Sequence, residues 1–256
     1  MRVAVKFAYD GREFHGFARQ PGLRTVEDEL IKTLIHHGFI EDTEVSRFRS
    51  ASRTDKGVSA LSNVIAFNTE SSKDQIFKKL TADVSDILIY GIAEVDSDFY
   101  PRYAKQRIYR YYLKKSDLDV EKVIHVAALF TGEHNFTNFA RIESFKDPLR
   151  TIDNIIIENQ EECFVIDFYA QTFLWNQIRR IVSAIYHVGC GDLQKEQLVE
   201  ALHNPDTPVD FGLAPPEPLL LKDILYNFEF DYDEKALSEL QELEQNIVSS
   251  FTCSSQ

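Results

Sequence analysis

The chain has 256 residues, of which 44% are hydrophobic and 12% aromatic, and a formal net charge of −13. This apolar content excludes a disordered chain, a collagen-like repeat and a coiled coil. The length fits one large domain or two halves with a common core, and we expect two halves. No segment approaches the roughly 20 apolar residues of a membrane span. The alternating residues 1–9 are typical of a strand and not of a signal peptide.

Apolar periodicity and turn signals predict alternating strands and helices along the first half of the chain. The strands are expected at residues 1–9, 47–51, 63–67, 87–95 and 108–114, and the helices at 26–35 and 72–82. The polar loop Ser52–Gly57 separates the second and third of these strands.

The second half shows the same mixture, with expected helices at 120–130, 173–188 and 194–203 and strands at 154–158, 163–170 and 224–230. Leucine and isoleucine at helical spacing within the acidic residues 231–256 leave three interpretations open: a docked helix, a dimer contact or a tail. No low-complexity linker separates the halves, so we predict an α+β fold whose two halves share a sheet. The expected divisions are 1–105, 106–230 and 231–256.

The three cysteines, Cys163, Cys190 and Cys253, are far apart and contain no C-x-x-C pair. This usage argues against a disulfide framework and a zinc ribbon, and it favours a reducing compartment, the cytoplasm. His36 and His37 are adjacent, so on a helix their rings diverge by about 100° and do not converge on a metal. The chain also lacks the phosphate-binding loop, the zinc-protease motif and the nucleophile elbow.

Charge is distributed unevenly along the chain. Residues 1–115 carry 19 Lys and Arg against 16 Asp and Glu, whereas residues 116–256 carry 9 against 25. A basic and aromatic strip in the first half contains Arg102, Lys105, Arg107, Arg110, Lys114 and Lys115 with Tyr103, Tyr109, Tyr111 and Tyr112. Such a strip suits an RNA surface, although a solvated strand face has the same composition.

Asp55 is the strongest candidate for chemistry. It lies in the loop Arg53-Thr54-Asp55-Lys56-Gly57 between two predicted strands. The two flanking cations favour the ionised carboxylate, which can act as a base or a nucleophile. Taken alone, the spacing favours a simple turn residue, because an Asp shortly before a Gly is the commonest signal of a hairpin turn.

The motifs around Asp55 extend this interpretation. Residues 51–60, Ala-Ser-Arg-Thr-Asp-Lys-Gly-Val-Ser-Ala, resemble the G-R-T-D-A-G-V-H-A signature of TruA-type tRNA pseudouridine synthases. Further segments are similar to family motifs in the same order: Tyr9-Asp10-Gly11 with Thr25-Val26-Glu27, Arg107-Ile108-Tyr109-Arg110-Tyr111, residues 132–139, residues 173–189 and residues 214–223. The chain departs from the signature at Ser52, Lys56 and Ser59, which stand where the family has Gly, Ala and His.

The resemblance implies two similar ferredoxin-like halves that share a continuous, mostly antiparallel sheet around a central basic cleft. It implies a homodimer that isomerises uridine to pseudouridine in the tRNA anticodon stem-loop without a metal or cofactor. Asp55 would be the essential carboxylate, Tyr109 would stack on the uracil, and Arg179, not its neighbour Arg180, would orient Asp55. Arg53 would help to extrude the nucleotide, because chemistry on a base requires its removal from the stack. The basic residues Arg102, Lys105, Arg107 and Arg110 would contact RNA.

Three alternatives remain open. In the first, the chain is a non-catalytic RNA-binding or tRNA-folding module in which Asp55 is only a turn residue. In the second, the same chemistry acts on another tRNA position or on another RNA. A carboxylate glycosidase is a more distant alternative, because no second acid has a reasoned place beside Asp55.

Overall fold

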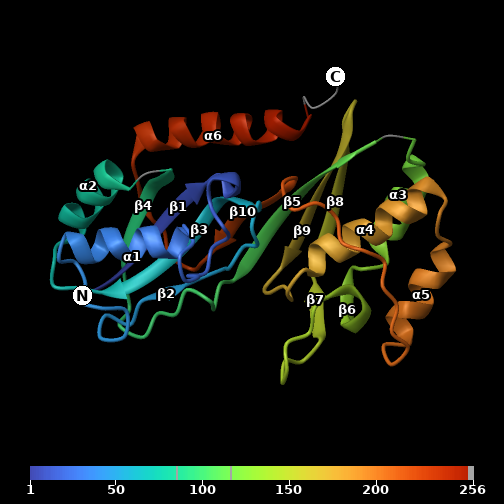
Figure 1. The fold of residues 1–256 in the computed structure, drawn as a ribbon, viewed down its shortest axis with the longest axis horizontal. Helices are drawn as coiled ribbons and strands as arrows, with labels where there is room; N and C mark the ends of the chain where they lie inside the picture. Colours follow the sequence, from blue (N-terminus) through green and yellow to red (C-terminus); the bar gives the residue numbers. More distant parts are fainter. Residues whose placement is uncertain (85, 116, 253–256) are drawn as a thin grey trace. The chain divides into compact units, whose positions relative to one another are not determined.

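The computed structural model describes residues 1–84, 86–115 and 117–252 (Figure 1). The chain divides into two compact units, one formed by Met1–Lys105 together with the residues from Leu220 onward, and the other by Gln106–Leu219. Both units combine helices with mostly antiparallel strands, which agrees with the expected mixture of α and β structure.

The first unit is built on a sheet with the strand order β11-β4-β1-β3-β10, and β2 adds to β3. β1 pairs antiparallel with β3 and with β4, whereas β10 runs parallel to β3. The strands are β1 (Arg2–Tyr9), β2 (Arg49–Ser50), β3 (Ser59–Asn68), β4 (Ile87–Val95), β10 (Leu219–Leu225) and β11 (Asp231–Tyr232). The helices are the 3₁₀ turn η1 (Gly11–Glu13), α1 (Val26–His36), α2 (Lys73–Asp83) and α6 (Glu234–Thr252).

β1 is buried along its whole length because side chains cover both of its faces. Successive side chains of a strand point to opposite faces. Ala8 packs with Ala236 of α6, and the rings of Phe7 and Tyr9 pack with Phe17. Coverage on both sides explains why β1 is apolar at most positions and does not show the strict alternation expected from the sequence.

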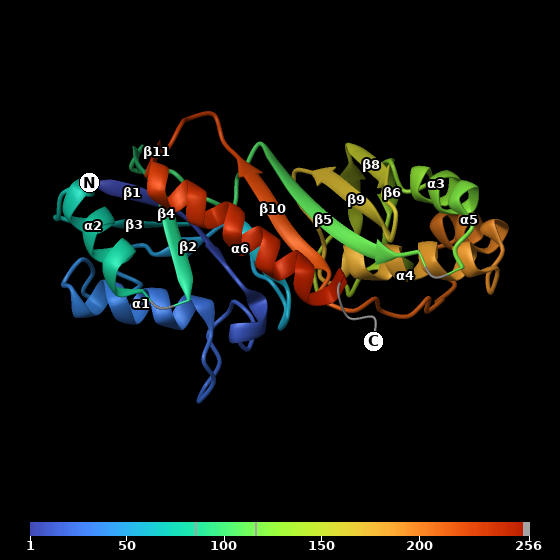
Figure 2. The same cartoon turned by 90° about the horizontal axis from the view of Figure 1, so that it is seen from above.

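The C-terminal segment forms α6, which lies across the strands of the first unit (Figure 2). Ala236 packs against Ala8 and Tyr90, and nearer the end of the helix Ile247 packs against Leu61 and Leu220. Of the three interpretations of this segment, the structure shows the docked helix. The apolar stripe is buried at Ala236 and Ile247 and partly buried at the leucines between them, and most of the acidic residues of the helix are exposed.

We expect Ile247→Val to lower the free energy of unfolding by about 0.5–1.5 kcal/mol, because it removes one methylene from a buried contact. Ile247 is 1% exposed. The matched control is Ile156→Val on the second unit, where the isoleucine is 47% exposed, and its effect should stay within about 0.5 kcal/mol. Urea unfolding followed by circular dichroism measures both. Equal effects of the two substitutions would contradict the docking of α6.

The second unit contains the antiparallel strand set β5-β9-β8 and the separate antiparallel pair β6-β7. Helices α3 and α4 pack against each other. The strands are β5 (Gln106–Lys114), β6 (Gly132–Asn135), β7 (Leu149–Ile152), β8 (Asn154–Asn159) and β9 (Cys163–Ala170), and the helices are α3 (Val120–Ala128), η2 (Thr137–Phe139), α4 (Gln177–Cys190) and α5 (Lys195–His203).

Several predicted elements have wrong bounds, and the strand expected at 63–67, for example, is β3, which begins at Ser59. The helix expected at 173–188 is α4, which starts at Gln177 because Asn176 takes a left-handed conformation with φ of 61°, a conformation that Asn tolerates. The Gln177 side chain accepts a hydrogen bond from the Leu174 amide at 2.8 Å and holds this entry. The strand expected at 224–230 is β10, which ends at Leu225. Beyond it, Phe228 and Phe230 pack their rings on each other instead of continuing the strand.

Candidate active site

Asp55 lies in the first unit, in the loop that joins β2 to β3. The neighbouring Thr54 is fixed at two atoms. Its carbonyl accepts a hydrogen bond from the Phe17 amide at 3.0 Å, and its Oγ1 shares a hydrogen bond of 2.8 Å with the Tyr9 hydroxyl. The carbonyl of Asp55 accepts from the Val58 amide at 3.1 Å, which closes the turn. The loop is therefore held in part by its backbone and by the Thr54 side chain.

Three glycines allow the loop to take this path. Gly57 has φ of +85°, a conformation that side chains other than glycine rarely adopt. Gly16 has φ of +90°, and a Cβ there would lie 3.3 Å from the Lys56 nitrogen. A Cβ on Gly11 would lie 2.3 Å from the Val58 carbonyl oxygen, which is far inside van der Waals contact. The Asp55 loop thus packs directly against the backbone of the loop that follows β1.

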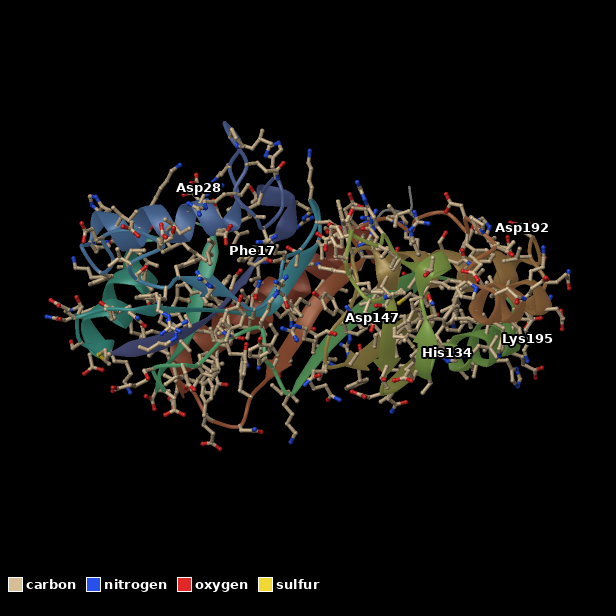
Figure 3. All side chains as sticks on the ribbon, turned by 90° about the horizontal axis from the view of Figure 1, so that it is seen from below. Phe17, Asp28, His134, Asp147, Asp192 and Lys195 are labelled. Carbon is tan, nitrogen blue, oxygen red and sulfur yellow. The ribbon has the colours of Figure 1, made fainter. Side chains whose placement is uncertain are left out.

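A cluster of four aromatic side chains packs next to the Asp55 loop and supports it. Phe7, Tyr9, Phe14 and Phe17 are almost completely buried, with ring centroids about 6.0–6.5 Å apart. Figure 3 labels Phe17 near the start of α1, where its carbonyl accepts from the Glu27 amide at 3.0 Å. Aromatic side chains bury large areas in fixed geometry. The cluster therefore couples α1, β1 and the Asp55 loop into one rigid support.

The departures from the family signature have defined places. Ser59 is 1% exposed and accepts a hydrogen bond from the Gly11 amide at 2.9 Å. Ser52 is buried, and its carbonyl accepts from the Asn63 side chain at 3.0 Å. Lys56 is exposed. Two of the three substituted residues thus contribute hydrogen bonds that position the loop, and the third adds a positive charge at the surface beside Asp55.

Within this loop, Asp55 is half-buried and both Arg53 and Lys56 are exposed. A half-buried carboxylate on a rigid loop is held ready for a bond-forming or proton-transfer role. Among the described residues there is no group of three or more His, Cys, Asp or Glu side chains that is placed to hold a metal ion. In the same part of the chain, no helix combines the length and the apolarity needed to cross a bilayer.

Tyr109 lies in the second unit, on β5. It is 9% exposed, and its ring meets Phe173 edge to face at a centroid distance of 5.3 Å. Tyr111, two residues along, is on the same face of the strand, and its hydroxyl donates to the Pro215 carbonyl at 3.1 Å. Burial raises the pKa of Tyr111, and the positive charge of Arg179 opposes that rise. Arg179 is thus close to the face of β5 that carries Tyr109.

The neighbours Arg179 and Arg180 have different surroundings. Nε of Arg179 donates to the Ala214 carbonyl at 2.7 Å, whereas Arg180 forms an ion pair of 2.8 Å with the exposed Asp210. The Ala214 amide in turn donates to the Arg179 carbonyl at 3.2 Å. The segment 214–216 and the start of α4, which are far apart in the sequence, therefore meet at Arg179.

The cations of the basic strip also divide into two groups. Arg107 is buried and donates to the Gln171 carbonyl. Arg110 forms a bidentate pair with Asp167, at 2.7 and 2.8 Å, and this pairing raises the pKa of Arg110 despite its partial burial. Arg102 and Lys105, at the end of the first unit, are exposed. The pairing with Asp167, in the next strand of the sheet, was not apparent from the sequence.

From the sequence alone, no supporting role was assigned to several residues that hold the site, although Tyr9 and Phe17 lie in the segment that resembles the family's opening motif. Tyr9, Phe17 and Asn63 hold the Asp55 loop through the hydrogen bonds given above. The signal available for Tyr9 and Phe17 was an unusual density of aromatic residues within positions 7–17. No comparable signal existed for Asn63, which lies inside a strand.

Comparison with known proteins identifies the class of this arrangement. A family model described as tRNA pseudouridine synthase matches residues 126–227. A relative from Thermococcus sibiricus, named tRNA pseudouridine synthase A, is 44% identical over 243 residues, covering 94% of this chain and 91% of that protein. A relative of the same name from Pyrococcus abyssi is 45% identical over 244 residues, again covering 94% and 91%. A solved Cbf5-Nop10-Gar1 complex matches 73% of this chain and 44% of that one at 14% identity and a TM-score of 0.35, too low to add to the argument.

The protein is therefore a pseudouridine synthase by class, and so an isomerase. Within that class, the chain belongs to the tRNA pseudouridine synthase A family, as identity above 40% over nearly the whole length of both relatives shows.

Proposed function

We propose that the protein converts uridine to pseudouridine in the anticodon stem-loop of tRNA and that Asp55 is its essential carboxylate. The observation that carries the proposal is the rigid loop that presents a half-buried Asp55 between the exposed cations Arg53 and Lys56. Relatives named tRNA pseudouridine synthase A support tRNA as the substrate. The resemblance of residues 51–60 to the family signature supports the role of Asp55.

The reaction is an isomerisation, so its atoms balance without a co-reactant. The bond between N1 of the uracil and C1′ of the ribose breaks, the base rotates, and a bond forms between C5 and C1′. The proton that leaves C5 is matched by one gained at N1. Asp55 is proposed to act directly on the nucleotide, as a nucleophile or as a base.

Tyr109 and Arg179 are proposed to complete the site. We propose that the two units share one continuous sheet and form a basic cleft in which both residues face Asp55. The apolar body and hydroxyl tip of Tyr109 suit stacking on uracil and transfer of a late proton. Arg180 is paired with the exposed Asp210, whereas Arg179 is close to Tyr111. Both observations support Arg179 as the partner of the carboxylate.

The basic residues are proposed to bind the RNA backbone. Arg53, Arg102 and Lys105 are exposed at the surface, and exposed cations suit contacts with RNA phosphates. Arg107 bonds the neutral Gln171 carbonyl and keeps its positive charge, so it is proposed to supply a positive field along β5. The charge of Arg110 is balanced by Asp167, so Arg110 is proposed to contact RNA while it keeps this partner. The resemblance further supports a homodimer, and the sparse cysteines support the cytoplasm as the location.

The test is incubation of the purified chain with unmodified tRNA transcripts, followed by mapping of pseudouridine at each nucleotide. Conversion is expected in the anticodon stem-loop and nowhere else. The matched control is a transcript in which the uridines of that stem-loop are replaced by cytidines, which should remain unmodified. Conversion at another site would support the proposed reaction but contradict the anticodon stem-loop as its target. Tight binding of tRNA without conversion would favour the RNA-binding module.

A further inference from the structure

A hollow of about 390 Å³ lies beside the Asp55 loop, wholly within the first unit. Its volume falls in the range of roughly 300–1,000 Å³ that is typical of ligand sites. Four arginines from four segments line it: Arg19 before α1, Arg49 on β2, Arg53 on the Asp55 loop and Arg102 after β4. Several arginines around one hollow are an arrangement that suits the binding of a phosphate.

The acidic side chains of the hollow do not offset this charge. Glu27 and Glu44 also line it. Glu27 accepts a hydrogen bond from the Arg19 amide at 3.1 Å, and its carboxylate lies 3.9 Å from the Arg19 side chain. Arg49 donates to the carbonyl of Phe48, which is neutral, at 2.7 Å. The cations therefore outnumber the acids even after the pairing of Arg19 with Glu27.

The excess of positive charge around β2 also affects the pKa of a nearby buried arginine, Arg2. Burial, and to a smaller extent the positive charges of Arg47 and Arg49, together lower the pKa of Arg2 to about 10. Like charges held together disfavour each other's ionised form. An anion bound at β2 would relieve this repulsion.

An aromatic wall completes the hollow. Tyr100 lines it, and its ring lies 5.2 Å from that of Tyr103, which is 82% exposed. Aromatic side chains beside cations are the usual platform for single-stranded RNA, because every base has a face that can stack. The hollow thus combines groups for a phosphate with a surface for a ring.

We propose that this hollow, the β2 pocket, binds one nucleotide of the RNA strand next to the target uridine. Arg49 and Arg102 hold its phosphate, and Tyr100 contacts its base or ribose. Arg53 belongs both to the pocket and to the Asp55 loop, and two residues of chain span at most about 7 Å. The pocket and Asp55 therefore receive nucleotides that are close together on the strand. The inference rests on the proposed function, since it requires an RNA substrate.

The test compares Arg49→Gln with Lys79→Gln, which removes the same charge from an exposed position on α2 of the same unit. For Arg49→Gln, we expect the Kd for an unmodified tRNA transcript to rise about tenfold. The slope of log affinity against log salt should fall by about 0.7–0.9, as for one lost phosphate contact. KM should rise while kcat at saturating tRNA is kept. Lys79→Gln should change none of these quantities.

Tyr100→Leu supplies a second, independent readout. It should weaken tRNA binding about tenfold without changing the salt slope, because it removes a stacking contact and no charge. Thermal unfolding of each variant shows whether it is folded. Uridine 5′-monophosphate and inorganic phosphate, titrated separately into the wild-type protein, distinguish a strand-binding pocket from a site for a free ligand.

The outcomes separate the pocket from the proposed function. If Arg49→Gln matches Lys79→Gln in affinity and salt slope while both convert tRNA, the β2 pocket is overturned and the proposed function stands. Tight binding of free phosphate with an unchanged tRNA slope would also overturn it. If the wild-type protein neither binds nor converts tRNA, the proposed function fails and the pocket proposal fails with it.

Discussion

Replacement of Asp55 by asparagine is expected to slow pseudouridine formation by more than about 10³-fold, because an amide is neither a nucleophile nor a base at neutral pH. The affinity for tRNA should stay within about threefold, since the substitution keeps the shape of the side chain and leaves the phosphate contacts in place. The loop itself is held by Thr54, Phe17 and Tyr9, so the variant should fold normally.

Single-turnover conversion of an unmodified transcript measures the chemical step, and filter binding measures affinity. Asp28→Asn is the matched control, because Asp28 is a surface carboxylate on α1 paired with Lys32 at 2.6 Å and should leave conversion unchanged. Full conversion by Asp55→Asn would show that the Asp55 carboxylate takes no part in the reaction. A loss of binding that equals the loss of conversion would assign Asp55 a structural role.

Gly11→Ala is expected to lower conversion about 100-fold, although Gly11 is proposed for no chemical role. The added Cβ would lie 2.3 Å from the Val58 carbonyl oxygen, so the Asp55 loop must move. A displacement of about 1 Å at a reacting group costs roughly this factor. Overpacking of this kind also lowers the free energy of unfolding by about 1–3 kcal/mol.

The control for Gly11→Ala is Gly38→Ala, which separates loop geometry from general stability. Gly38 has φ of +67° with no atom near its would-be Cβ, so alanine there costs about 1 kcal/mol of backbone strain. Urea unfolding should show a loss in both variants, whereas single-turnover conversion should fall only in Gly11→Ala. Normal conversion by Gly11→Ala would show that the contact with Val58 does not position Asp55.

Elements with strong periodicity were predictable from the sequence, because their pattern reflects local geometry. Residues 163–170 form β9 and residues 87–95 form β4, both as expected. The pattern near Thr25 correctly predicted the start of α1 at Val26, but the Thr25 side chain makes no capping hydrogen bond. Short polar strands such as β6 and β7 were missed, since four residues with few apolar side chains carry no periodic signal.

The sequence by itself determined the family, through motifs that appear in order along the chain, and it singled out Asp55 as the candidate carboxylate. Its helix and strand patterns depend on contacts between residues only a few positions apart. Tertiary structure decided which distant residues meet. It placed α6 and most of β10 in the first unit with Ala8 and Leu61, and it joined Ser59 to Gly11. It also gathered Arg19, Arg49, Arg53 and Arg102 around one hollow. These contacts are set by sheet order and by the packing of buried faces, which no short stretch of sequence encodes.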